Sequence, residues 1–282
     1  MEINEIEMSA VHEAPWESTL LLPVGDLQLG ASGSDVERFK RHIDWGMQHP
    51  RVAFLGMGDY VDVASPSNRS ELRGARLYDS VQDMLDEAAE RQRQQFMALV
   101  AGTEGRWVGL LEGHHFFQFA DGSTTDTRIA HELGTPFLGS CAFVRLVYRN
   151  GKHYTTCTIW CHHGAGSSVK ASGPLNRLEN LVHYFDADIY LMGHMSKKVA
   201  APLDQLYMSG TAPYRIKHRT KIIAGTGGFL QGYQQGSARG QTARGSYVEQ
   251  GMMAPVALGG VAITITPVST SKGDSLDLKV SL

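Results

Sequence analysis

The stretch RWVGLLEGHH, residues 106–115, joins an apolar run to two adjacent histidines. The apolar run over 106–111 predicts a buried strand. It ends at Gly113, where the chain can bend, and His114 and His115 follow directly. Neighbouring residues of a strand point to opposite faces. At a bent strand end the two imidazoles are therefore suited to two different tasks at one site.

The same pattern recurs elsewhere in the chain. Five apolar strands are each expected to end in Gly or Cys followed by Asp or His, at Gly25-Asp26, Gly58-Asp59, Gly113-His114, Cys161-His162 and Gly193-His194. In open α/β sheets, ligands bind outside the carboxyl ends of the strands. We therefore expect these polar side chains to converge on one site.

The remaining sequence alternates predicted strands and helices. Strands are expected at 19–24, 51–58, 106–111, 142–149, 153–161, 187–192, 198–208, 221–225 and 259–266. Helices are expected at 34–48, 79–100, 126–133 and 175–186. Ser34 and Glu37 fit a capping box, and Asn150-Gly151 predicts a hairpin. The segment 65–70 is polar and has no predicted element. Residues 1–18 are set apart as an N-terminal extension, and 19–282 are expected to form a single domain.

Composition narrows the class of protein. Of 282 residues, 42% are hydrophobic and 20% are charged, which is ordinary for a soluble globular chain. A net charge of -3 gives no global attraction to nucleic acid or to anionic membranes. No apolar run approaches the ~20 residues that span a bilayer, and no signal peptide is visible. We expect a cytoplasmic protein without a membrane partner.

Aspartate and histidine at the strand ends favour a metal site. Their oxygen and nitrogen donors are ligands of Mn, Zn, Fe and Ni. The three cysteines have no spacing typical of a structural zinc site. Carboxylates and imidazoles from five strands suit two divalent ions that share a bridging carboxylate, an arrangement used in hydrolysis of phosphoesters.

In the same order, the five strand ends resemble the signatures of the calcineurin-like metallophosphoesterases. Those signatures are Asp-x-His, Gly-Asp-x-x-Asp, Gly-Asn-His-Asp/Glu, a strand-end His, and Gly-His-x-His. Their counterparts here are Asp26-Leu27-Gln28, Gly58-Asp59-Tyr60-Val61-Asp62, Gly113-His114-His115-Phe116, His162-His163-Gly164 and Gly193-His194-Met195-Ser196. The resemblance covers about residues 20–200. It implies a four-layer α/β/β/α sandwich, in which two mixed sheets pack face to face with helices outside.

The resemblance also implies roles for individual residues. Asp59 matches the carboxylate that bridges two metals, and Asp26 matches a ligand of the first. His194 matches a ligand of the second, as does His163, with His162 as the alternative. His115 matches the histidine that protonates the leaving group or stabilises the transition state, and Asp62 matches the carboxylate that orients it.

Three positions depart from the family pattern. Gln28 and Ser196 replace histidines that bind the first metal, and both are weaker, neutral donors. Whether Ser196 contacts a metal is left open. His114 replaces an asparagine that binds the second metal, and imidazole is the stronger donor for transition metals. We therefore expect a tight second site and a weaker first site.

The function expected from the resemblance is metal-dependent hydrolysis of a phosphoester. A metal-bound hydroxide attacks phosphorus, and His115 assists the leaving oxygen. A phosphodiester in nucleic acid or a nucleotide is the first choice of substrate, which would make the protein a nuclease or phosphodiesterase. Phosphomonoesterase and protein phosphatase activities are the alternatives. A competing hypothesis is a degenerate metal-binding or nucleic-acid-binding module without turnover. The sequence leaves the native metal and the oligomeric state open.

Arg69, Arg73 and Arg76 follow the second signature in or near the polar segment. Arginine can hold a phosphate through bidentate contacts. A solvated loop face is the interpretation that the sequence favours for these three side chains.

Overall fold

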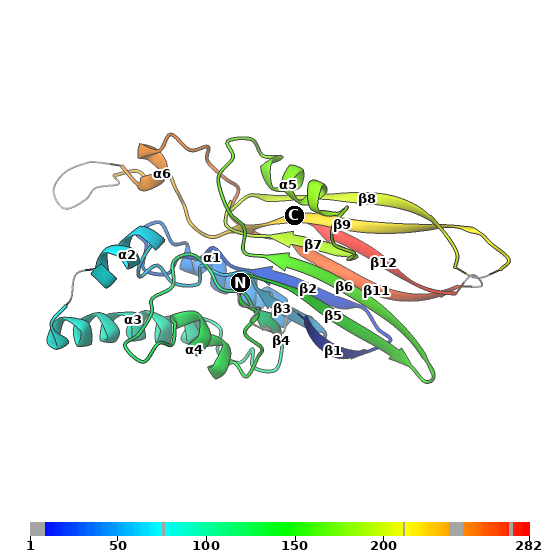
Figure 1. The fold of residues 1–282 in the computed structure, drawn as a ribbon, viewed down its shortest axis with the longest axis horizontal. Helices are drawn as coiled ribbons and strands as arrows, with labels where there is room; N and C mark the ends of the chain where they lie inside the picture. Colours follow the sequence, from blue (N-terminus) through cyan, green and yellow to red (C-terminus); the bar gives the residue numbers. More distant parts are fainter. Residues whose placement is uncertain (1–8, 75–76, 211, 237–244, 271–272) are drawn as a thin grey trace.

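The computed structural model describes residues 9–74, 77–210, 212–236, 245–270 and 273–282. Two mixed β-sheets pack face to face, and helices cover their outer faces (Figure 1). This arrangement confirms the predicted α/β/β/α sandwich.

The five-stranded sheet has the order β12-β11-β2-β3-β4. Its strands are β2 (Thr19–Val24), β3 (Val52–Gly56), β4 (Trp107–Leu110), β11 (Ala262–Thr270) and β12 (Gly273–Ser281). Strands β2, β3 and β4 are parallel, whereas β11 pairs antiparallel with both β2 and β12. The carboxyl ends of β2, β3 and β4 therefore lie at the same edge.

The seven-stranded sheet has the order β1-β5-β6-β7-β9-β10, and β8 also pairs with β9. Its strands are β1 (Ser9–Pro15), β5 (Cys141–Asn150), β6 (His153–His162), β7 (Ile189–Met192), β8 (Lys198–Met208), β9 (Ile216–Gly228) and β10 (Gly259–Gly260). Strands β6 and β7 are parallel, so His162 and Met192 end side by side.

Alternating side chains of the central strands supply two cores. Leu21 and Leu55 face the other sheet, whereas Leu22 and Phe54 face the helices, and all four are fully buried. Burial on both faces explains why β2 and β3 are continuous apolar runs. Helices α1 (Val36–Met47), α3 (Asp79–Leu99) and α4 (Thr125–Glu132) cover the five-stranded sheet. Helix α5 (Gly173–Leu181) covers the seven-stranded sheet.

The structure departs from the sequence prediction in local features. Helix α1 is capped by Asp35, whose side chain accepts from the amide of Arg38 at 2.9 Å, whereas the Ser34 hydroxyl donates to the Leu27 carbonyl. The predicted capping box is therefore wrong, because Ser34 already has another partner. Three further elements were not predicted, namely α2 (Pro66–Gly74), the short α6 (Tyr247–Gln250) and β12.

The N-terminal range also contains an element. Within residues 1–18, which were set apart as an extension, 9–15 form β1 and pair in parallel with β5. Residues 1–8 lie outside the described part of the chain.

Candidate metal centre

Backbone hydrogen bonds bring the predicted site residues together where the strands end. The amide of Asp26 donates to the Gly58 carbonyl at 3.0 Å, and that of Gln28 donates to the Asp59 carbonyl at 2.9 Å. From the other sheet, the amide of His194 donates to Oδ2 of Asp26 at 2.9 Å. Loops after β2, β3 and β7 are thus joined across the two sheets.

The backbone at these positions is unusual. Six described non-glycine residues have a positive φ, and five of them lie in the predicted signatures: Asp26 (49°), Gln28 (49°), Asp59 (54°), His194 (63°) and Ser196 (49°). Such conformations are uncommon for residues with a Cβ and persist where the surrounding structure enforces them, often at functional sites. These positions follow the ends of β2, β3 and β7, where the candidate site lies.

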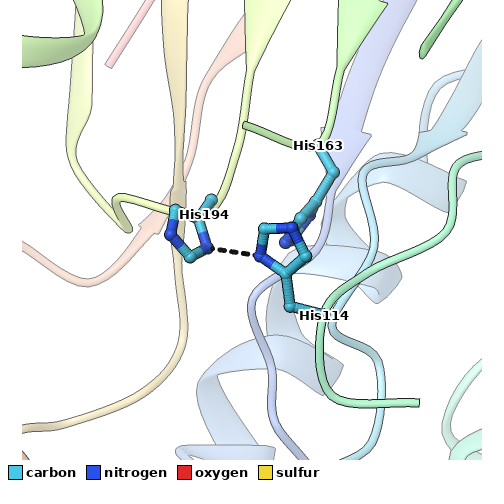
Figure 2. A group of neighbouring side chains, drawn as sticks. All are labelled: His114, His163 and His194. Atoms are coloured by element: carbon cyan, nitrogen blue, oxygen red, sulfur yellow. Dashed lines mark hydrogen bonds between the residues drawn. The ribbon is translucent and has the colours of Figure 1, made fainter. Parts of the chain in front are cut away.

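Three imidazoles form the centre of the site (Figure 2). The rings of His114, His163 and His194 follow β4, β6 and β7, and each offers a nitrogen within 4.8 Å of the other two. Nδ1 of His114 lies 3.1 Å from Nδ1 of His194. Two nitrogens that bind one ion at ~2.1 Å lie about 3.0–3.4 Å apart at the usual coordination angles. The spacing therefore fits two ligands of one cation.

His163, and not His162, belongs to this group. Its Nδ1 donates to the Met57 carbonyl at 2.7 Å, which leaves Nε2 directed at Oδ2 of Asp59, 3.5 Å away. A histidine ligand commonly donates its second ring nitrogen to a carbonyl in this way. His162 instead accepts from the amide of Gly164 at 2.7 Å, and its ring lies 5.9 Å from that of Trp160.

Asp59 and Asp26 each keep one buried oxygen that accepts no hydrogen bond. Oδ1 of Asp59 accepts from the amides of His114 and His115. Oδ2 of Asp59, Oδ1 of Asp26 and Nε2 of His163 are buried and have no hydrogen-bond partner. Unpaired buried polar atoms are costly, and a cation bound among these three atoms would satisfy all of them. The residues present therefore fit a divalent cation.

Burial and the charge of His163 are the main influences on the pKa values within the cluster. Burial raises the pKa of Asp26 to about 7. Burial also acts to raise the pKa of Asp59, but the facing imidazole of His163 outweighs it and holds that pKa well below its usual range. Burial alone would lower the pKa of His163, yet Asp59 raises it to about 9. Burial and the charge of His163 lower the pKa of His114 to about 4.

His115 and Asp62 form a pair beside the histidine cluster. Nδ1 of His115 lies 2.7 Å from Oδ1 of Asp62, and the two side chains are 25% and 32% exposed. This hydrogen bond is the main reason why the pKa of His115 is raised. Because the amide of His115 also donates to Asp59, the pair is anchored to the metal-ligand candidates while its ring remains open to solvent.

Gln28 and Ser196 are both half-buried, and Ser196 lies near Asp26. Gly228 packs against this group, since a methyl group there would lie 2.8 Å from Cβ of Asp26 and 3.0 Å from the Ser196 hydroxyl.

Asp126 was missed from the sequence because it lies in the first turn of a predicted helix, where acidic residues are common. The structure buries it completely, and its Oδ2 accepts from the amide of Gly113 at 2.9 Å. Burial raises its pKa to about 7. Its contact holds the bend from which His114 and His115 project.

No family model matches the chain, and no curated protein matches it. Three solved structures resemble it weakly over nearly its full length. They are vacuolar protein sorting 29 from Cryptosporidium parvum (11% identity, TM-score 0.33, 94% of this chain and 98% of that chain), a single mutant of Vps29 from Entamoeba histolytica (13%, 0.34, 94% and 100%), and a conserved uncharacterized protein, a predicted phosphoesterase, from Streptococcus pneumoniae TIGR4 (10%, 0.32, 93% and 98%). At these scores the likenesses carry no conclusion about ligands or activity.

Among the described residues, no helix combines the length and apolar character needed to cross a membrane.

Proposed function

We propose that this chain is a metal-dependent hydrolase of phosphoesters. The observation that carries the proposal is the meeting of three imidazoles and two buried carboxylates, with unpaired donor atoms, beside a histidine–aspartate pair. The imidazoles and carboxylates would be enough for a protein that only binds metal. The pair of His115 and Asp62 is the feature that favours catalysis over simple binding.

Each residue of the cluster has a proposed task. His114, His163, His194 and Asp59 would hold one divalent cation tightly, while Asp26, Asp59 and Gln28 would hold a second one weakly. Such cations lower the pKa of water and neutralise the charge on a phosphoryl group. Manganese, zinc, iron and nickel all suit this donor set.

The proposed role of His115 is to protonate the leaving oxygen. Asp62 fixes Nδ1 of the ring, so Nε2 is available to deliver a proton, and the carboxylate stabilises the imidazolium form before transfer. Because the hydrogen bond raises the pKa of His115, the ring is protonated over a wider pH range than an isolated histidine.

A phosphodiester of nucleic acid or a nucleotide is the proposed substrate class, and phosphomonoesters and phosphoproteins are the alternatives. Bis-p-nitrophenyl phosphate and p-nitrophenyl phosphate separate diesterase from monoesterase activity when assayed with Mn, Ni, Zn, Fe and Mg. Asp59→Asn should abolish hydrolysis. Asp44→Asn on α1, an exposed carboxylate paired with Lys40, is the matched control and should leave it unchanged.

The competing proposal, a binding module without turnover, makes a different prediction in the same experiment. Metal would bind and Asp59→Asn would weaken its binding, but neither ester would be hydrolysed with any of the five metals. Hydrolysis that Asp59→Asn leaves intact would refute the proposed site itself.

A further inference from the structure

We propose that Arg69 is a positioning residue that fixes His115 relative to Asp62. This inference rests on the proposed role of that pair in hydrolysis. Arg69 lies in α2, seven residues after Asp62.

One guanidinium nitrogen of Arg69 joins the two segments that carry the pair. Nη1 has two N–H groups, and these share three acceptors, the carbonyls of Ala64 at 2.5 Å, His114 at 2.6 Å and Phe116 at 2.9 Å. Ala64 follows Asp62 by two residues, and His114 and Phe116 are the immediate neighbours of His115. The contacts therefore lie on both sides of the His115–Asp62 hydrogen bond.

The plane of the guanidinium is also fixed. Its central carbon lies 3.8 Å from the centre of the Phe116 ring, a cation–π contact that holds the group over the segment after His115. A planar, permanently charged group with several donors suits bonds to three carbonyls that come from different parts of the chain. These contacts overturn the expectation of a solvated loop face for Arg69. The side chains of Arg73 and Arg76 lie outside the described residues.

The segment around His115 needs such support because it lies beyond the end of β4 at Leu110. A backbone bond from the amide of Val63 to the His115 carbonyl, at 3.3 Å, is a long direct link between the two segments. A small displacement of a catalytic group costs rate steeply. Arg69 supplies shorter, charge-assisted bonds at the same place.

The first test measures backbone exchange in the metal-free full chain, so it needs no activity. In Arg69→Met, amide hydrogen exchange of a peptide covering 111–117 should be faster than in the wild type by about tenfold or more. Arg128→Met is the matched control. Arg128 also stacks on an aromatic ring, with its central carbon 3.5 Å from the ring centre of Phe119, but it pairs with Asp121 and Glu90. The control should leave exchange over 111–117 unchanged.

The second test separates positioning from general stability. With the diester substrate and saturating metal, Arg69→Met should lower kcat by about tenfold and leave KM and metal affinity unchanged. Should Arg69→Met fail to fold, Arg69→Gln is measured against the same two criteria. Exchange over 111–117 that matches the wild type overturns the inference, as does faster exchange with an unchanged kcat. If the wild-type chain hydrolyses neither ester, the proposed function fails, while the exchange result still decides whether Arg69 holds the segment.

Discussion

At residue scale, His114 makes this site different from the family pattern that the sequence resembles. An imidazole stands where that pattern has an amide, and its Nδ1 lies 3.1 Å from Nδ1 of His194. Gln28 and Ser196 replace histidines of that pattern, so they weaken the donors of the other half of the site. The proposed donor set is therefore unequal, with three imidazoles on one side and the Asp26 carboxylate with two neutral side chains on the other.

Replacing Ser196 with histidine tests this inequality. In the wild type, calorimetric titration with manganese should give one tight and one weak site. Ser196→His should tighten the weak site by about tenfold or more, because imidazole is a better ligand than a hydroxyl, and leave the tight site unchanged. Two equally tight sites in the wild type would contradict the assignment.

The pair of His115 and Asp62 predicts a change in pH dependence. Asp62→Asn removes the charge that raises the pKa of His115, so the pKa falls. A protonated general acid is active below its pKa and is lost as the pH rises through it. The alkaline decline of kcat should therefore begin at lower pH in Asp62→Asn, with kcat at neutral pH lower by about ten- to a hundredfold. Metal affinity should not change, and an unshifted alkaline limb would exclude His115 as the acid.

Some site residues were predictable from the sequence and others were not. Asp26, Asp59 and His194 follow glycine at the ends of apolar runs, so their convergence could be inferred. The choice between His162 and His163 depends on where β6 ends, which periodicity does not give to one residue. Arg69 was beyond prediction because its partners are backbone carbonyls, and every sequence supplies those.

At the scale of elements, the glycine bends after the strands are as important as the side chains they place. Gly113 lies so close to Asp59 that a Cβ would be 2.0 Å from the Asp59 amide nitrogen and 2.3 Å from Oδ1. Gly113 packs against the Asp59 carboxylate. A side chain at position 113 would therefore displace that carboxylate.

Gly113→Ala should therefore destabilise the chain by about 3 kcal/mol or more and eliminate tight metal binding. Gly134→Ala is the control, since Gly134 has a φ of +64° after α4 but open space around it. It should cost about 1 kcal/mol through backbone strain alone and leave metal binding intact. Urea unfolding and calorimetry measure both effects. Equal losses in the two variants would show that packing against Asp59 is unimportant.

Elements with strong periodicity or composition were predicted well, and those held by long-range contacts were not. Strand β2 and the β5–β6 hairpin match the expected ranges closely. Helix α2 has no apolar stripe, and Arg69 links it to the segment around His115. Strand β12 does carry alternating Leu276, Leu278 and Val280, a period-two signal that could have revealed it.

At the scale of the whole molecule, the unpaired atoms of Asp26, Asp59 and His163 couple the site to stability. A cation that binds only the folded chain stabilises it by mass action. At a hundredfold excess over Kd this amounts to ~2.7 kcal/mol, or a rise in Tm of about 5 °C. Differential scanning calorimetry with manganese should show this rise, and EDTA should reverse it. Asp59→Asn should show no rise, and an equal rise in that variant would place the cation elsewhere.

Strand β1 has a consequence for how the chain is made. It pairs in parallel with β5, from Ser9 opposite Phe143 to Pro15 opposite Arg149. During synthesis on the ribosome, β1 emerges long before β5. Its backbone N–H and C=O groups have no strand partner until β5 is synthesised. Shortening the chain up to Pro15 would uncover the β5 edge in the finished protein. Expression yield and aggregation in the cell should therefore be more sensitive to changes at this end than its sequence, without a strong apolar pattern, would suggest.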